Sequence, residues 1–252
     1  MGSYQHLRGD DRMKKDILGV GIDDLTLEEA VAAGCALLEQ PGCHYVVTPN
    51  PEFLLTAKKN DAFREVLNAA DLSLPDGIGV IYAAKLLGRP LKGRAPGVDF
   101  AQGLMERLSQ SEKKLFLLGA KPGVAEQAAE NLCGRYPGLN ICGVHDGYFK
   151  DDAPVVEKIR VSKADVVFVC LGAPKQELWM AKNGPETGAA LLVGLGGCLD
   201  VFAGTVQRAP EGWQKAGMEW LYRLIKEPSR FGRMAKLPLV LVDALATRFS
   251  GK

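Results

Sequence analysis

The chain has 252 residues, of which 47% are hydrophobic, and a formal net charge of +1. A chain of this length can bury one substantial core. The near balance of charge argues against a protein that binds nucleic acid through an overall basic surface. No apolar run reaches the ~20 residues that a membrane-spanning helix needs, and the N-terminus lacks the apolar stretch of a secretory signal. Residues 1–12 are polar, and we interpret them as a leader outside the fold, of the kind added for expression.

The N-terminal part of the chain alternates between β-rich runs and helical patterns, beginning with a predicted strand over 17–22. Thr26 and Glu29, three residues apart, form a capping box that begins a helix. A second strand over 45–47 ends in Thr48-Pro-Asn-Pro, where two prolines stop the strand and hold an extended turn. A helical stretch to about Ala70, a short strand over 72–74 and a helix over 78–87 follow.

The middle of the chain is more regular, with short apolar strands separated by helices. This spacing favours a parallel sheet covered on both faces, and right-handed crossovers would make it doubly wound. The predicted fold class is therefore α/β, with a Rossmann-like, doubly wound, mostly parallel sheet in one main domain over 13–207. The expected strands are 114–118, 140–144, 165–171 and 190–195, and the expected helices are 124–135, 154–163 and 175–183.

The six cysteines form no CxxC pair, and each lies within or beside an apolar run. Disulfide frameworks and metal sites show a different spacing. We interpret these residues as reduced core residues of a cytoplasmic protein. They are Cys35, Cys43, Cys133, Cys142, Cys170 and Cys198.

Residues 208–252 differ in character from the rest. They hold nine Lys or Arg and four Asp or Glu, a charge of +5, so the preceding residues carry −4. We expect a helical, basic C-terminal appendage that associates with an anionic membrane surface, because large apolar residues fall on one helical stripe with cations beside them. A helix packed on the body and a dimer interface are the open alternatives. The stripe consists of Trp213, Trp220, Leu221, Leu224 and Ile225.

Candidate chemistry follows the strands, because ligands of an open α/β sheet bind beyond the carboxyl ends of its strands. The segment 119–123 places backbone N–H groups and a helix N-terminus where a diphosphate would be favoured, although a purely structural turn explains it equally well. Asp76, between Pro75 and Gly77, is a candidate base or a helix N-cap. Arg94 is a candidate partner for an anion or an ordinary surface arginine.

Several enzyme classes lack their motifs. There is no GxxxxGK[ST], and no GxGxxG follows a strand with an acidic residue about twenty residues later. The three histidines, His6, His44 and His145, are too few for metal clusters or Ser-His-Asp triads. No Asp-x-Asp is present, although metal-dependent sugar-nucleotide enzymes commonly use that spacing to hold a divalent ion. If a diphosphate leaves in this protein, something other than a metal must stabilise it.

Six stretches, in order along the chain, resemble the TagA/WecG/CpsF family of bacterial glycosyltransferases. Together they extend over nearly the whole chain from about Ile17 to Pro238. The matching stretches are Thr48–Glu52, Leu74–Gly79, Arg94–Gly97, His145–Phe149, Gly172–Glu177, and Gly194–Gly204 with its Asp200.

The resemblance implies an inverting, metal-independent transferase without cofactors. It would move N-acetylmannosamine from its UDP donor to the 4-hydroxyl of N-acetylglucosamine on undecaprenyl diphosphate, in the synthesis of the wall teichoic acid linkage unit or a related polymer. The protein would lie peripherally on the inner face of the cell membrane. The open alternatives are another donor such as UDP-N-acetylmannosaminuronic acid, a nucleotide-dependent oxidoreductase, and a non-catalytic nucleotide-binding assembly protein; a homo-oligomer is also left open.

The resemblance also implies roles for individual residues. Asp76 would be the catalytic base, and Arg223, Arg230 and Arg233 of the appendage would close over the diphosphate. The expected donor-binding residues are Thr48, Asn50, Arg94, Gly119, Tyr148, Gly172, Lys175, Gln176 and Asp200.

Overall fold

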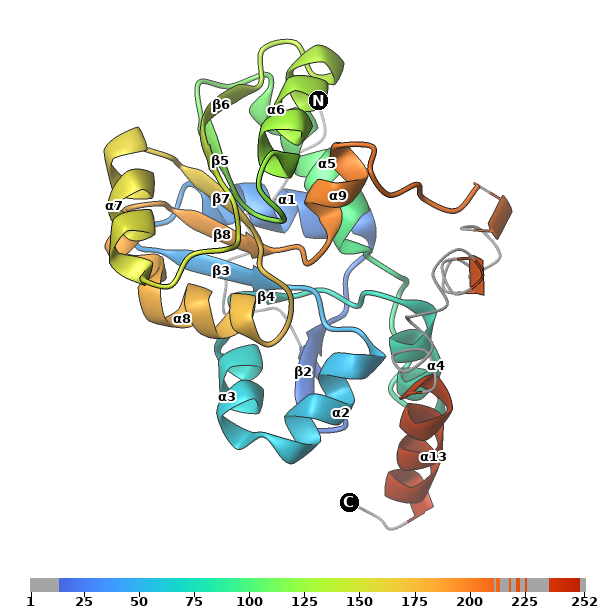
Figure 1. Cartoon of the computed structure of the whole chain (residues 1–252). Helices are drawn as coiled ribbons and strands as arrows, with labels where there is room; N and C mark the ends of the chain where they lie inside the picture. Colours follow the sequence, from blue (N-terminus) through green and yellow to red (C-terminus); the bar gives the residue numbers. More distant parts are fainter. Residues whose placement is uncertain are drawn as a thin grey trace, which may run out of the picture.

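The computed structural model describes residues 14–210, 212–213, 218, 221–222, 225 and 236–249. Its central element is a six-stranded sheet in the order β4-β3-β8-β7-β5-β6, and every pair of neighbouring strands is parallel (Figure 1). The predicted α/β fold with a doubly wound parallel sheet is confirmed. The strands are β3 (His44–Val47), β4 (Leu72–Ser73), β5 (Lys114–Gly119), β6 (Asn140–His145), β7 (Val166–Cys170) and β8 (Leu191–Gly194).

Alternate residues of the central strands enter two separate cores. Leu115 and Leu117 of β5 pack into one core, whereas Phe116 and Leu118 pack into the other. This division follows from the two-residue period of a strand. It explains why the strands are apolar throughout, since both faces of the sheet are buried.

Helices cover both faces of the sheet (Figure 1). Beside the six-stranded sheet, a short hairpin packs in the second core. The helices of the first core are α1 (Leu27–Leu37), α5 (Gly97–Leu108), α6 (Val124–Arg135) and α9 (Cys198–Phe202). Those of the second are α2 (Pro51–Lys59), α3 (Asp61–Ala69), α4 (Ile78–Leu86), α7 (Asp152–Ser162), α8 (Lys175–Thr187) and α13 (Lys236–Phe249).

The sheet reverses its winding direction between β5 and β7. From β5 the chain crosses outward to β6, whereas from β7 it crosses the opposite way to β8. Connections that diverge from neighbouring strands leave a crevice outside their carboxyl ends, where ligands of such folds bind. The segments that follow β5 and β7 begin at Ala120 and Leu171, so the fold places two of the predicted donor loops at this point.

The structure differs from the expected elements in several details. The predicted strand over 17–22 is wrong, because the chain turns at Leu18 and Gly19, whose φ angles are 57° and 87°. These positive angles suit a two-residue hairpin turn, which joins the antiparallel strands β1 (Lys14–Ile17) and β2 (Val20–Asp23). The helical stretch to about Ala70 is two helices, because Asn60 caps α3. Helices α5 and α9 were not foreseen.

The C-terminal helix α13 packs on the body, beside α4 (Figure 1). Val240 and Ala244 are fully buried there. The Asp243 carboxylate lies 2.9 Å from the Lys58 ammonium at the end of α2, and the Arg248 guanidinium donates to the Leu86 carbonyl at the end of α4. Pro238 is tolerated because it lies in the first turn of the helix. No helix among the described residues is long and apolar enough to cross a membrane.

All six cysteines are free thiols. Cys170 and Cys198 are buried, but Cys133 is exposed on α6. The reduced state of the six thiols stays a prediction, whereas the assignment of Cys133 to the core is wrong. Its neighbours Leu132 and Ala128 take the buried face of that helix.

Candidate active site at the carboxyl edge of the sheet

Backbone hydrogen bonds join the loops around Asp76 at the carboxyl ends of β3 and β4. The Asp76 N–H donates to the Pro49 carbonyl at 2.9 Å, and the Ala95 N–H donates to the Pro75 carbonyl at 3.0 Å. The structure thus brings the loops that carry Asn50, Asp76 and Arg94 together, although they lie far apart in the sequence.

Thr48 connects this group of loops to β8. Its side chain is buried, and Oγ1 donates to the Gly194 carbonyl at 2.9 Å. A Cβ atom added at Gly97 would lie only 3.2 Å from Thr48 Cγ2. Thr48 therefore packs against both the end of β8 and the beginning of α5, and its hydroxyl is used inside the scaffold.

Gln176 joins the ends of β7 and β8 in the same way. Its Oε1 accepts hydrogen bonds from the Gly172 N–H at 3.2 Å and from the Gly196 N–H at 3.0 Å. The side chain is buried, with 1% of its surface exposed. The buried Gln176 side chain thus holds together the loops that follow β7 and β8.

The loops after β5 and β6 complete the edge. The Gly147 N–H donates to the Ala120 carbonyl at 2.9 Å, and the Lys175 ammonium reaches the Gly147 carbonyl at 3.1 Å. The same ammonium lies 4.6 Å from the centroid of the Phe149 ring, which is a cation–π distance. Next to it, the Tyr148 side chain is exposed. A cation and an exposed aromatic ring therefore lie together at this end of the edge.

Two glycines lie at the carboxyl ends of β5 and β7. A Cβ atom at Gly119 would lie 2.3 Å from the Cys170 carbonyl oxygen, so only glycine allows these strand ends to approach so closely. Gly172 has a φ angle of 76° and open space where a side chain would be, which leaves its backbone accessible.

The capping interpretation of Asp76 is wrong. The N-cap of α4 is Gly77, and no side chain caps that helix. Asp76 itself is half-buried on the preceding strand-end loop. By contrast, Asn50 does cap a helix, because its Oδ1 accepts from the Glu52 and Phe53 N–H groups at the start of α2. The Asn50 Oδ1 is therefore used within the scaffold, as the Thr48 hydroxyl is.

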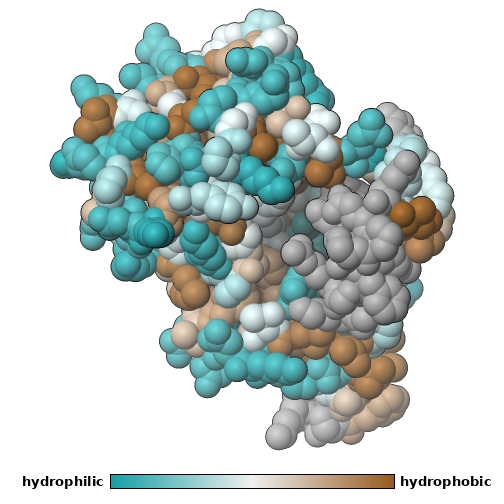
Figure 2. Space-filling view, in the orientation of Figure 1, coloured by the Kyte–Doolittle hydropathy of each residue, from teal (hydrophilic) through white to brown (hydrophobic). Residues whose placement is uncertain are grey.

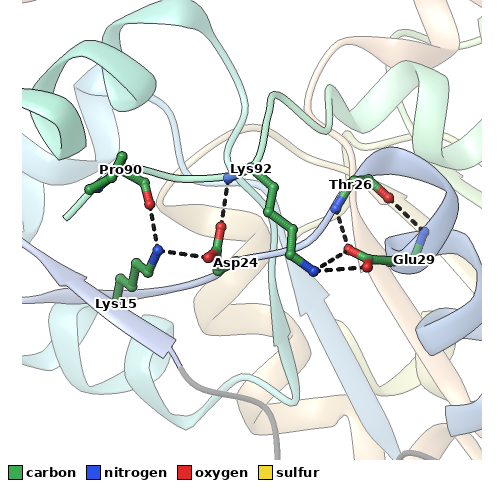
Figure 3. Close-up of polar contacts among 6 residues, drawn as sticks. All are labelled: Lys15, Asp24, Thr26, Glu29, Pro90 and Lys92. Atoms are coloured by element: carbon green, nitrogen blue, oxygen red, sulfur yellow. Dashed lines mark hydrogen bonds and ion pairs between the residues drawn. The ribbon is translucent and has the colours of Figure 1, made fainter.

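A network of polar contacts fixes the loop that leads to Arg94 (Figure 3). The Asp24 carboxylate accepts from the Lys15 ammonium and from the Lys92 N–H, both at 2.6 Å. The Lys15 ammonium also reaches the Pro90 carbonyl. On the other side, the Lys92 ammonium pairs with Glu29 of the capping box at 2.8 Å. The loop is thereby tied to the hairpin and to α1 before it reaches Arg94, which is half-buried.

In the part of the chain that the structure describes, four helices of nine or more residues begin at this edge without a side-chain cap, namely α4, α5, α6 and α8. The first N–H groups of a helix have no partner within the helix and carry a partial positive charge. A helix N-terminus without a capping side chain is suited to bind an anion. The edge therefore collects several such termini, together with Lys175, around the loops just described.

Asp200 and the basic appendage complete the comparison with the expected site. Asp200 lies in the first turn of α9, and its carbonyl oxygen accepts from the Val206 N–H. The described residues contain no group of three His, Cys, Asp or Glu that could hold a metal ion. Arg223, Arg230 and Arg233 lie outside the described residues, and the expected donor contacts stay predictions.

A family model described as the glycosyl transferase WecG/TagA/CpsF family matches residues 15–252. The chain belongs to this family. It is 41% identical over 208 residues to the N-acetylglucosaminyldiphosphoundecaprenol N-acetyl-beta-D-mannosaminyltransferase of Bacillus spizizenii (strain ATCC 23059 / NRRL B-14472 / W23), an alignment that covers 82% of this chain and 81% of that protein. It is 35% identical over 231 residues to the protein of the same name from Staphylococcus aureus (strain MW2), with 90% and 91% covered.

Five of the six motifs thus correspond to loops at strand ends, and the sixth, Arg94–Gly97, lies between α4 and α5 and is hydrogen-bonded to the loop after β4. Sequence reasoning missed two features of this edge. Glu177 stands within a quoted motif but received no role, and nothing in the local pattern showed that it would be buried. Asp24 and Lys92 were also missed, because only the fold brings the hairpin next to the loop before Arg94.

Proposed function

We propose that this protein is an inverting glycosyltransferase that moves N-acetylmannosamine from UDP-N-acetylmannosamine to the 4-hydroxyl of N-acetylglucosamine on undecaprenyl diphosphate. The names of its relatives describe transfer of N-acetyl-beta-D-mannosamine to N-acetylglucosaminyldiphosphoundecaprenol. The product would serve the wall teichoic acid linkage unit or a related polysaccharide. Among the structural observations, the gathering of a carboxylate, an arginine and uncapped helix N-termini at one edge of the sheet carries the proposal.

Asp76 would act as the general base. In a single displacement, the acceptor oxygen attacks the anomeric carbon while the bond from that carbon to the UDP oxygen breaks. The hydroxyl proton passes to the Asp76 carboxylate, and the sugar changes configuration. A base on a firm loop suits this task, and the loop is held by hydrogen bonds of the Asp76 N–H and the Pro75 carbonyl.

Departing UDP gains negative charge, which the protein must stabilise. Arg94, Lys175 and the N-termini of α6 and α8 would supply this stabilisation without a metal ion or other cofactor. Arg223, Arg230 and Arg233 would add to it from the appendage. Two contacts of described residues support this role: Arg208 pairs with Asp99 in the first turn of α5 at 2.6 Å, and α13 packs along α4, whose N-cap follows Asp76.

We further propose that the protein lies on the inner, anionic face of the membrane, where its lipid-linked acceptor would be. The outer face of α13 exposes apolar side chains, with 57% of Leu239, 62% of Val242 and 85% of Phe249 accessible. Figure 2 shows this apolar surface at the lower right, where Figure 1 places α13. Apolar side chains beside a basic segment favour insertion at the level of lipid headgroups.

A panel of UDP-sugars, each offered with a short-chain lipid diphosphate carrying N-acetylglucosamine, tests the proposal. We expect turnover with UDP-N-acetylmannosamine and equal rates with and without EDTA. Faster transfer of the uronic acid would replace the donor assignment, and loss of activity in EDTA would refute metal independence. UDP binding without transfer of any sugar would favour a non-catalytic assembly protein.

A further inference from the structure

Glu177, in the first turn of α8, carries a buried carboxyl group to which the proposed mechanism gives no role. Its side chain is 0% exposed. Oε1 accepts a hydrogen bond from Gln176 Nε2 at 2.6 Å, whereas Oε2 has no hydrogen-bond partner among the described residues. Burial raises the pKa of this carboxyl to about 7. Burying a carboxyl group in such surroundings costs folding free energy. Stabilisation of the fold therefore does not explain why position 177 holds an acid.

Gln176, which donates to Glu177, is also the residue that joins two loops of the site. Gln176 Oε1 accepts from both the Gly172 N–H and the Gly196 N–H. A side-chain amide can present either its oxygen or its NH₂ group to these donors. Only the orientation with Nε2 facing away from the glycines satisfies both, and the acceptor that Nε2 meets in that orientation is Glu177.

We propose that Glu177 is a positioning residue of the donor site. By accepting from Gln176 Nε2, it fixes the amide so that Oε1 joins the loop after β7 to the loop after β8. Both loops lie at the carboxyl edge, where the donor diphosphate would bind. This inference rests on the proposed function, because the loops matter to turnover only if the donor binds there.

The side chains of Gln176 and Glu177 also pack closely against the end of β8. A Cβ atom at Gly194 would approach Gln176 Nε2 at 3.0 Å and Glu177 Oε1 at 3.4 Å. The pair therefore packs directly against the end of β8, with Met180 on the same side. A shift of the amide would displace the Gly172 and Gly196 backbones, since both are bonded to the same oxygen.

The test compares Glu177→Met, Gln176→Met and the double variant in steady-state kinetics and in calorimetric titrations with UDP. We expect Glu177→Met to fold, because an apolar side chain suits the buried position. Its KM for the donor and its UDP dissociation constant should rise about tenfold, with kcat changed less than about threefold. If Glu177 acts through Gln176, the double variant should be no worse than Gln176→Met alone. Glu177→Gln keeps an acceptor and should stay close to wild type.

Thr187→Val is the matched control. Thr187 is buried at the far end of the same helix, where its Oγ1 donates to the Gly184 carbonyl at 2.6 Å. This variant should lower the melting temperature without changing the donor KM. Should Glu177→Met fail to fold, Glu177→Leu takes its place.

Two results would overturn the inference: an unchanged donor KM and UDP affinity in the apolar Glu177 variant, or additive effects in the double variant. Failure of the proposed function looks different, because the wild-type enzyme would then transfer no sugar. In that case the UDP dissociation constants of the same variants still report whether the loops keep their geometry.

Discussion

Thr48, Asn50 and Gln176 each use side-chain atoms to hold backbone groups at the carboxyl edge. A substitution at any of them therefore changes loop geometry as well as contacts with a substrate. The sequence motifs mark these residues but do not show whether a side chain holds a loop or contacts a substrate. The hydrogen bonds show the role in holding loops, and they join residues up to 146 positions apart.

Glu177 gives a prediction at the scale of one residue. Its pKa is raised from 4.5 to about 7 by burial, so the folded protein holds the proton more tightly than the unfolded chain. The stability from this group is fully present below pH 4.5 and is lost as the pH rises through 7. Compared with Glu177→Gln, the wild-type free energy of unfolding should fall by roughly 2–3 kcal/mol between pH 5 and pH 8.

Urea unfolding of both proteins at pH 5 and pH 8, with a reductant for the six free thiols, measures this difference. A constant difference between the two proteins would mean that Glu177 does not change its protonation on folding.

For elements with strong local sequence patterns, the predicted bounds agree well with the structure. The helix predicted over 124–135 matches α6 to the residue, because Gly123 and the apolar period mark its limits. Helix α5 was missed although Val98, Ala101 and Leu108 follow a helical spacing and are buried. The hairpin could not be found from propensity, since Leu18 is an unusual residue for a turn with positive φ.

Asp24 should affect catalysis through the loop before Arg94 (Figure 3). Replacement by Ala removes the acceptor for both Lys15 and the Lys92 N–H. Because small displacements of a catalytic group are costly, we expect kcat to fall about tenfold while the protein stays folded, as circular dichroism can verify. Asp16→Ala is the control, since its exposed pair with Arg89 should contribute little. Equal activity of the two variants would remove Asp24 from this role.

Viewed as a whole, the molecule has its candidate site at the carboxyl edge and an apolar helix face at its C-terminal end. The sequence predicted the α/β class and this edge, because apolar strands alternate with helices. It could not predict that α13 lies along α4, since the covering of one helix by another depends on the assembled surface. The basic charge of residues 208–252 was visible in the sequence, but the exposed apolar face of α13 was not.

Membrane association should depend on that face. Changing Val242 and Phe249 to Ser removes exposed apolar area without touching the buried Val240 and Ala244. Since a buried apolar side chain is worth about 1.5–3 kcal/mol, binding to anionic vesicles should weaken at least about tenfold in a flotation assay. Val161→Ser is the control, because this valine is 69% exposed on α7. Equal loss in the control, or none in the double variant, would exclude α13 from the membrane contact.

The most direct test of the central claim is the turnover of Asp76→Asn with UDP-N-acetylmannosamine and the lipid-linked acceptor, read together with UDP affinity from calorimetry. Asparagine preserves the shape of the side chain but cannot accept the acceptor's proton. We predict a loss of kcat of about 10²- to 10⁴-fold, with a UDP dissociation constant within about threefold of wild type. Turnover close to that of the wild type would contradict the assignment of Asp76 as the base.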